Sequence, residues 1–343
     1  MLLRLQAQLF GVDESKLFVI GIIIGVVLSI LILIKMYANG PSCEIRRFLH
    51  GKYVLITGAN SGIGKETAYE LARRGAYVIM ACRDIEKGKK ARAEIKRKVP
   101  SADIVIKHLD LASKASIDRF VYEFREVYSR LDILINNAAT GFSRERETTE
   151  DGFELAFGTN HLGHFYLTYK LMSLLEDSSP SRVINVSSKI AFTAKMNWDD
   201  LQSERNYNLA EAYNQSKLAN ILHAKELARR YEFSNVRTCS VHPGVSLTEL
   251  SSISFRNFWV KIFYYPLYPI LWLITKSVNK AAQTTVHCAL IEHIALSSGG
   301  IYQDCRQVYL KDCEAEDPVA GRRLWKESLR LLGLPDDEPD LEP

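Results

Sequence analysis

Short apolar runs alternate with longer amphipathic stretches from about residue 52 to residue 334. The runs predict strands at residues 53–57, 77–81, 104–108, 131–135, 182–186, 236–241 and 299–302, and the stretches between them predict helices at about 62–74, 86–97, 114–128, 151–175, 210–230 and 280–294. Strands that alternate with helices pack as a parallel sheet covered on both faces. The pattern therefore predicts a single doubly wound α/β sheet with right-handed helical crossovers, whose ligands gather where the strands end.

The stretch before this alternation is almost purely apolar. Leu17 to Ile34 contains eighteen residues and no charge, and Lys35 follows it. This length is at the lower limit for a membrane-spanning helix, and residues up to Ala38 extend it if the Lys35 side chain reaches out of the apolar layer. A cleaved signal peptide would have a shorter apolar core that ends at small residues. We therefore predict a transmembrane anchor.

Basic residues beside the anchor predict its orientation. Four follow the apolar segment and two precede it: Lys35, Arg46, Arg47 and Lys52 against Arg4 and Lys16. Because cytosolic flanks carry an excess of Lys and Arg, the count places the following domain in the cytosol.

These features divide the chain into five parts. They are an N-terminal flank (1–16), the transmembrane anchor (17–38), a linker (39–51), one catalytic domain (52–334) and an acidic, proline-interrupted tail (335–343) that we expect to be disordered.

Composition excludes several classes of function. The net charge is only +4 and the basic residues are dispersed, so nucleic-acid binding has no support. The six cysteines lack CxxC or His-partnered spacing, which indicates free thiols in a reducing compartment and no metal site.

Residues 255–275 are too aromatic for an ordinary surface. A helix packed in the core, an oligomer contact such as that of a homodimer, a lid over an apolar pocket and a segment in the membrane interface all fit this composition. A second membrane span does not fit, because Arg256, Lys261, Pro266 and Pro269 interrupt the run.

A glycine-rich turn joins the first predicted strand to the first predicted helix. Glycine permits a tight turn and close approach of the backbone, and the N-terminus of the following helix offers N–H groups and a positive dipole to a pyrophosphate. With a strand before it and a helix after it, the turn predicts a Rossmann-type dinucleotide site at Gly58, Asn60, Ser61, Gly62, Ile63 and Gly64.

A tyrosine and a lysine four residues apart form the first candidate for chemistry. Tyr213 and Lys217 face the same way on a predicted helix. A neighbouring cation favours the phenolate, which brings a tyrosine toward proton transfer at neutral pH. The same spacing also fits a half-buried tyrosine beside a solvated lysine. Ser187 and Ser188 end another predicted strand, and strand alternation lets only one of them face the site.

The motifs together resemble the short-chain dehydrogenase/reductase family from about residue 52 to residue 332. The resemblance is carried by Thr57–Gly64, Asn136–Ala138, Asn160, the serine pair, Tyr213 with Lys217, and Pro243 with Gly244, in the family's order. The chain is most similar to the microsomal retinol dehydrogenases, in Ala81–Asp84, Asn160–Phe165, Ser216–Ile221, Val241–Gly244 and Ala282–Thr285. Ala139 stands where the family has a glycine, and we expect the added methyl group to be tolerated.

The resemblance implies roles for four catalytic residues. Ser188 would donate a hydrogen bond to the substrate carbonyl oxygen, and Tyr213 would give or take the proton. Lys217 would lower the pKa of the tyrosine and hold the nicotinamide ribose, and Asn160 would order a water molecule. The resemblance thus favours Ser188 over Ser187.

It also implies further cofactor contacts. Asp110 would hold the adenine edge and Asn137 would lie near its ribose, with Tyr213, Lys217, Pro243 and Gly244 completing the cofactor-binding set. For Asp110, a helix N-cap is the purely structural alternative.

The end of the second predicted strand bears on cofactor choice. An arginine there accommodates the 2′-phosphate of NADP, whereas a carboxylate binds the 2′-hydroxyl of NAD. The chain has Arg83, which favours NADP(H), followed by Asp84, for which capping of the next helix is the structural alternative.

We therefore expect a membrane-anchored, NADP(H)-dependent oxidoreductase of an apolar alcohol/aldehyde pair, with retinol and retinal as the lead, facing the cytosol from the endoplasmic reticulum. Steroids, long-chain aldehydes and polyprenals are alternative substrates, and a non-catalytic scaffold on the same fold is the other class. The partners are then an apolar small molecule, held by Ser188, Phe258, Trp259 and Phe263, and the bilayer.

Overall fold

The computed structural model describes residues 14–141, 143–244 and 268–335. In this part of the chain one sheet has the strand order β3-β2-β1-β4-β5-β6-β7-β8. The strands are β1 (Tyr53–Thr57), β2 (Tyr77–Cys82), β3 (Ile104–His108), β4 (Ile133–Asn136), β5 (Ser181–Val186), β6 (Val236–His242), β7 (Gly300–Gln303) and β8 (Arg306–Val308). Neighbouring strands from β1 to β7 pair in parallel, so the predicted doubly wound sheet is confirmed.

Strand β8 was not predicted. It pairs antiparallel with β7, after a turn in which Asp304 and Cys305 adopt left-handed backbone conformations. Neither residue gives the glycine signal typical of such turns, and a three-residue strand shows too little alternation to be recognised.

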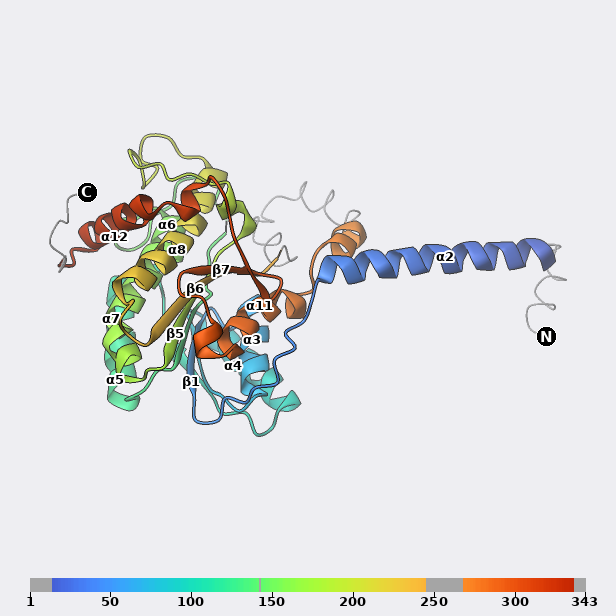
Figure 1. The fold of residues 1–343 in the computed structure, drawn as a ribbon, viewed down its shortest axis with the longest axis horizontal. Coiled ribbons are helices and arrows are strands. Elements are labelled where there is room, and N and C mark those ends of the chain that lie inside the picture. Colours follow the sequence, from blue (N-terminus) through green and yellow to red (C-terminus); the bar gives the residue numbers. More distant parts are fainter. Residues whose placement is uncertain (1–13, 142, 245–267, 336–343) are drawn as a thin grey trace.

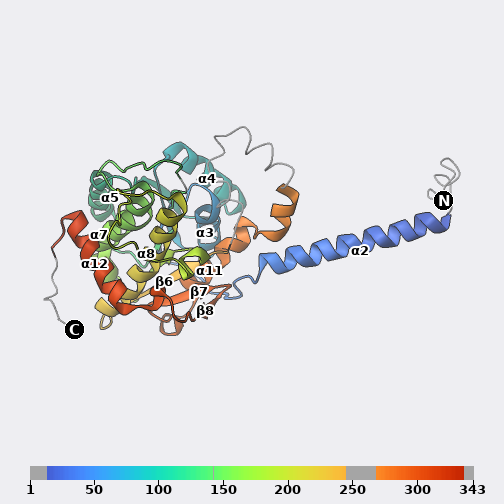
Figure 2. The same cartoon turned by 90° about the horizontal axis from the view of Figure 1, so that it is seen from above.

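Helices cover both faces of the sheet (Figures 1 and 2). On one face lie α3 (Gly62–Ala72), α4 (Ile85–Lys98) and α11 (Val278–Leu290), and on the other α5 (Lys114–Val127), α7 (Gly163–Asp177) and α8 (Leu209–Arg230). Each face of the sheet has its own apolar core, and side chains along β1 alternate between them. Leu55 packs with α5, α7 and α8, whereas Val54 and Ile56 pack with α3, α4 and α11. Strand β1 is thus buried on both sides, as its unbroken apolar run predicts.

The helix predicted at 151–175 begins later and is interrupted. Gly152 has a φ of 84° and Thr148 bridges Glu154, so the chain turns before the helix starts. The short helix α6 (Leu155–Phe157) then leads through a π-helical turn (Gly158–Leu162) into α7. The carboxylate of Glu154 caps this start by accepting from the N–H groups of Ala156 and Phe157. The helix predicted at 280–294 differs in the other direction: it starts and ends earlier than predicted, at Val278 and Leu290.

A final helix, α12 (Pro318–Leu332), was also not predicted and packs on the outside of α8. Its Trp325 lies edge-on to Phe165 of α7, with ring centroids 4.7 Å apart. The guanidinium of Arg230, at the end of α8, lies 4.4 Å from the centre of the same indole. The helix therefore closes the apolar face that α7 and α8 leave open.

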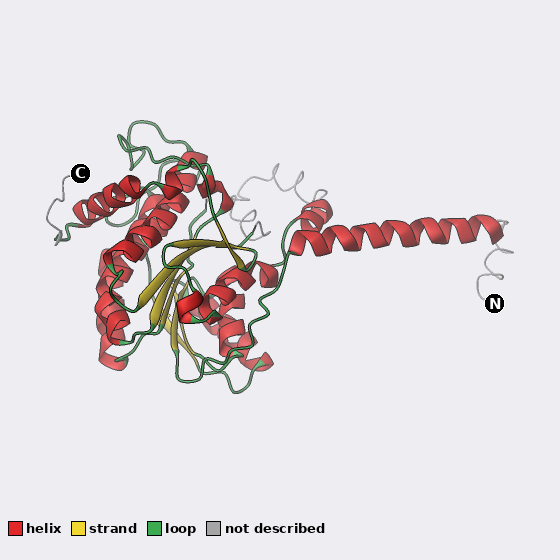
Figure 3. Ribbon diagram, viewed as in Figure 1, coloured by secondary structure: helices red, strands yellow, loops and turns green. Residues whose placement is uncertain are grey.

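Helix α2 (Glu14–Asn39) projects away from the domain (Figures 1 and 3). It is the one described helix long and apolar enough to cross a membrane, and its apolar side chains from Phe18 onward are exposed. The following residues lie along the domain: the Cys43 N–H donates to the side-chain carbonyl of Gln283 (3.0 Å), and Leu49 is buried. The predicted flank up to residue 13, the tail from residue 336 and most of the aromatic segment lie outside the described residues.

Candidate active site

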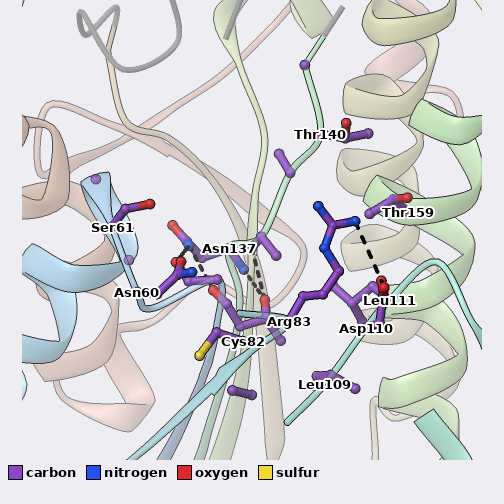
Figure 4. A pocket seen from close by; sticks show the side chains of 18 of the residues that line it. Asn60, Ser61, Cys82, Arg83, Leu109, Asp110, Leu111, Asn137, Thr140 and Thr159 are labelled. Carbon is purple, nitrogen blue, oxygen red and sulfur yellow. Dashed lines mark hydrogen bonds and ion pairs between the residues drawn. The ribbon is translucent and has the colours of Figure 1, made fainter. Parts of the chain in front are cut away.

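A cleft of about 950 Å³ opens where the strands end (Figure 4). It contains all the predicted cofactor residues except Pro243 and Gly244: Gly58, Asn60, Ser61, Gly62, Ile63, Gly64, Arg83, Asp110, Asn137, Tyr213 and Lys217. Residues from four strand ends and from α8 thus meet at one site, as the topology of an open parallel sheet requires.

The glycine turn packs tightly against the end of β4. Gly58 has a φ of +64°, and a Cβ atom built on it would lie 2.8 Å from the Cα of Ala138. A Cβ on Gly64 would lie 2.5 Å from Nδ2 of Asn137. That amide nitrogen donates to the carbonyl of Thr57 at 2.8 Å, so it holds the turn in place. Only glycine fits at these two positions without a shift of the backbone.

Helix α3 starts directly at this turn. Its N-cap is Ser61, whose side chain makes no capping hydrogen bond. The first N–H groups of α3 therefore lack a side-chain cap and remain available for an anion, which is the arrangement that binds a pyrophosphate.

A buried histidine connects the turn to the helix layer. The Thr57 hydroxyl accepts the N–H groups of Asn137 and Ala138, each at 2.9 Å, and lies 2.8 Å from Nε2 of His164. The other ring nitrogen of His164 lies 2.9 Å from the carbonyl oxygen of Asn160. Burial lowers the pKa of His164 to about 4, so the ring is neutral at physiological pH. His164 belongs to the motif Asn160–Phe165 quoted above but was not predicted as a site residue.

Asn160 is fully buried and does not line the cleft. Its side-chain oxygen accepts the N–H of Thr140 at 2.8 Å, and its side-chain nitrogen donates to the Thr140 carbonyl at 3.2 Å and to the Ser216 hydroxyl at 3.0 Å. The amide thereby fixes the loop after β4 to α8. The predicted role of Asn160 in ordering a water molecule stays a prediction.

Tyr213 and Lys217 lie together on α8, which begins after an N-cap at Asn208. The ammonium of Lys217 is 5.7 Å from the centre of the Tyr213 ring and donates to the carbonyl of Val186 at 3.3 Å. Lys217 is only 2 % exposed and Tyr213 only 8 % exposed, yet both line the cleft. A lysine so deeply buried beside a tyrosine differs from the solvated surface lysine that the spacing alone also allows.

The two serines after β5 have different surroundings. The Ser187 hydroxyl donates to the carbonyl of Lys217 at 2.6 Å, so it is committed to holding α8. Ser188 is buried in extended conformation at the start of a 3-10 turn (Lys189–Phe192) and is not among the residues that line the cleft.

The remaining predicted residues lie beside the cleft or outside the described chain. Pro243 and Gly244 follow the end of β6, and Gly244 has a φ of +91° with the Lys276 side chain packed against it. Phe258, Trp259 and Phe263 lie outside the described residues.

Arg83 leaves the end of β2 with its side chain 73 % exposed at the rim of the cleft. Its nearest charged partner is Asp110, at 3.9 Å (Figure 4). Asp84 caps α4 by accepting the N–H of Lys87 at 3.0 Å, which is the structural alternative given for it. Asp110 is not an N-cap: its carboxylate accepts the N–H of Ala112, and Ser113 caps α5.

Ala139 also lines the cleft and is exposed. Among the described non-glycine residues, a positive φ occurs at four positions, and Ala139 is not one of them. The methyl group therefore costs no backbone strain. Leu109 and Leu111 line the cleft as well and were not predicted, although they flank Asp110.

Comparisons with known proteins agree with this geometry. A family model described as "short chain dehydrogenase" matches residues 52–257. Human retinol dehydrogenase 13 is 45 % identical over 316 residues, which is 91 % of this chain and 93 % of that protein. Mouse retinol dehydrogenase 12 is 42 % identical over 301 residues, 88 % of this chain and 92 % of that protein.

Solved structures share the fold. A crystal structure of an uncharacterized protein from Mycobacterium paratuberculosis superimposes with a TM-score of 0.67 at 32 % identity, and the match covers 86 % of this chain and 98 % of that one. A short-chain alcohol dehydrogenase from Sinorhizobium meliloti, at 21 % identity, has a TM-score of 0.58 over 75 % of this chain and 96 % of that one.

Proposed function

The chain belongs to the short-chain dehydrogenase family, as its motifs predict, and from that premise we propose that this oxidoreductase interconverts retinol-like alcohols and their aldehydes with NADP(H) at a membrane. The observation that carries the proposal is the pair Tyr213 and Lys217, buried together at the wall of a cleft whose glycine turn fits a dinucleotide.

The cleft fits a nicotinamide dinucleotide. Gly58 and Gly64 let the turn pack against itself and the end of β4, where any Cβ atom would clash, and the uncapped start of α3 offers N–H groups to the pyrophosphate. Asp110 and Asn137 would hold the adenosine half, and Lys217 would hold the nicotinamide ribose. When bound, the cofactor supplies or accepts the hydride.

The proton is handled by the chain's own residues. Tyr213 donates it to the oxygen of an aldehyde, or takes it from an alcohol, and the charge of Lys217 favours the phenolate that this exchange needs. We assign the hydrogen bond to the substrate oxygen to Ser188, because the neighbouring Ser187 hydroxyl is already bound to the Lys217 carbonyl.

Arg83 supports a preference for NADP(H) over NAD(H). Its guanidinium is largely exposed at the cleft, and its one charged partner among the described residues is Asp110, at 3.9 Å, whereas Asp84, the competing carboxylate, is engaged in capping α4. A cation at the end of β2 favours a 2′-phosphate.

The proposed substrate class rests on the relatives and on α2. Proteins that carry the name retinol dehydrogenase match about nine-tenths of the chain at 42–45 % identity. An exposed apolar helix of membrane-spanning length suits a substrate that partitions into a bilayer. We propose anchoring in the endoplasmic reticulum membrane with the domain in the cytosol, and Phe258, Trp259 and Phe263 as part of the apolar pocket.

A substrate screen with the purified full-length protein in detergent tests the proposal. All-trans-retinal with NADPH is expected to be a good substrate, and catalytic efficiency should rise with the chain length of aliphatic aldehydes, because each buried methylene contributes roughly 0.8 kcal/mol. A polar ketose should be poor. A flat profile, or a preference for the ketose, would contradict the assignment to apolar carbonyls.

A further inference from the structure

The end of the apolar helix α2 is attached to a second, short apolar helix. Residues 268–274 are helical, and the Lys35 ammonium donates to the carbonyl of Trp272 in the last turn of this helix and to that of Thr275, at 2.8 Å, just after it. The last carbonyl groups of a helix have no partner within it, so Lys35 satisfies that of Trp272 and also holds the carbonyl just beyond the helix end. The same ammonium lies 4.4 Å from the centre of the Trp272 ring.

Further contacts continue from this point into the catalytic domain. The side-chain oxygen of Asn39, the last residue of α2, accepts the N–H of Ser277 at 2.9 Å, and Ser277 is the N-cap of α11. Lys280 of α11 donates to the Ser42 hydroxyl. The end of α2, helix 268–274 and α11 thus lie side by side (Figures 1 and 2), and α11 packs directly on the sheet.

Helix 268–274 has no charged residue, and none of its side chains is buried. Tyr268, Ile270, Trp272 and Ile274 are 44, 56, 49 and 56 % exposed. Apolar side chains gathered in this way are unfavourable in water and mark a contact surface. The neighbouring α2 presents its own exposed apolar side chains, including Leu33, so the two apolar surfaces adjoin.

The occupant that fits this surface is lipid. Seven helical residues span about 10 Å, which is far too short to cross a bilayer but matches a helix lying in its interface. Tyrosine and tryptophan are enriched at that depth, and a lysine at the end of a spanning helix is placed there too. The helix adjoins α2, so the membrane that α2 enters is already beside it.

We propose that helix 268–274 lies in the interface of the same bilayer that α2 spans, and that Lys35 clamps the two together, so that the catalytic domain is held at the membrane in one orientation. This inference rests on the membrane anchoring proposed above. The clamp also lies near the site: Lys276, two residues after helix 268–274, packs against Gly244 at the end of β6 and binds Asp304. The edge of the sheet that carries the cleft is thereby linked to the bilayer contact.

Tryptophan quenching by brominated lipid tests the inference. The full-length protein, carrying Trp259→Phe to simplify emission, is reconstituted in phosphatidylcholine vesicles whose acyl chains are brominated close to the headgroup, and in unbrominated vesicles. We expect bromine to quench emission, and Trp272→Phe to abolish most of that quenching. The matched control combines Trp272→Phe with Phe233→Trp, which moves the indole to a fully exposed position between α8 and β6, where the strands begin. This control should show no quenching.

Lys35→Leu tests the clamp separately from the anchor, because it removes the donor and extends the apolar span of α2. Retention in alkali-washed membranes should be unchanged, whereas quenching of Trp272 should fall. If the protein stays in alkali-washed membranes but the quenching does not depend on Trp272, the inference is overturned and the anchor stands. That result would indicate a protein partner or a second copy on this surface. Quenching in Lys35→Leu equal to that of the parent would overturn the clamp. Release of the parent protein by alkali would overturn the anchor itself, and the inference with it.

Discussion

Nε2 of His164 lies 2.8 Å from the hydroxyl of Thr57, and the second contact of the ring, from Nδ1 to the Asn160 carbonyl, sets the direction of this hydrogen bond. The Asn160 carbonyl oxygen beside Nδ1 can only accept, so in the neutral ring Nε2 has no proton and accepts from the Thr57 hydroxyl, which also lies 3.4 Å from the Ile135 carbonyl. Nδ1 of His164 then carries a proton and donates to the carbonyl of Asn160. A neutral histidine thus joins the glycine turn after β1 to the π-helical turn before α7.

We expect His164→Ala to destabilise the fold. The Thr57 hydroxyl and the Asn160 carbonyl would each lose a hydrogen bond worth about 1 kcal/mol, and removal of the fully buried ring would leave a cavity. Urea unfolding should therefore show a loss of roughly 2 kcal/mol or more. His108→Ala, at the exposed end of β3, is the control and should change stability by less than about 0.5 kcal/mol. Equal effects would mean that His164 does not hold the two turns.

Buried histidines should make the protein less stable in mild acid. Burial lowers the pKa of His164 and His242 to about 4 and that of His223 to about 3, from an ordinary value of 6.5. Below pH 6.5 the unfolded chain takes up these protons and the folded chain does not, so the free energy of unfolding falls as the pH drops toward 4 and is level above 6.5. Urea midpoints between pH 4 and pH 8 measure this slope. His223→Gln should flatten it, and an unchanged slope in that variant would rule out His223 as a contributor.

Tyr213→Phe should abolish most turnover and leave cofactor binding intact. The substitution removes the proton carrier and keeps the ring beside Lys217, and loss of general acid–base catalysis costs about a hundredfold or more. Steady-state kinetics with retinal and a fluorescence titration with NADPH measure the two effects. Near-normal turnover at saturating cofactor would refute the assigned proton transfer.

Arg83→Ala should reduce cofactor selectivity. If the guanidinium binds the 2′-phosphate, NADPH binding weakens by about 1.5–3 kcal/mol, the range for a charged hydrogen bond, while NADH binding hardly changes. Arg92→Ala, an exposed arginine on α4, removes the same charge away from the cleft and should leave both affinities unchanged. An equal loss of affinity for NADPH and NADH would show that Arg83 supports the fold and does not bind the 2′-phosphate.

The orientation of the domain can be measured with protease. Four basic residues follow the apolar span and two precede it, which favours a cytosolic domain. Protease added to intact microsomes should therefore digest the catalytic domain. Protection that disappears only when detergent opens the vesicles would place the domain in the lumen.

The central strands could be predicted because their apolar runs are continuous. Strand β1 is buried on both faces and reads as an unbroken apolar segment before a glycine, so both its place and the turn after it follow from local sequence. Helix α12 was missed although its ends carry local signals: an N-cap at Asp317, a proline in the first turn and Gly333 in the left-handed conformation after the last turn.

Site residues held by distant partners were harder to predict. The sequence placed Asn160 in the site, but its partner Thr140 is twenty residues away, and only the tertiary fold brings the two together. Similarly, strand alternation left the choice between Ser187 and Ser188 open. The contact that distinguishes them, from Ser187 to the Lys217 carbonyl, joins a strand to a helix and has no local pattern.

The position of α12 also sets an order of events during synthesis. This helix is the last described element to leave the ribosome, and it covers the outer face of α8, the helix that carries Tyr213. Until it arrives, Phe165 and its neighbours on the nascent chain lack the Trp325 ring that shields them, and exposed apolar surface of this kind promotes aggregation. A premature stop before Pro318 would remove none of the described residues that line the cleft, yet it would leave the catalytic helix uncovered. Such a truncation would therefore lower the yield of folded protein and would not act on the catalytic step itself.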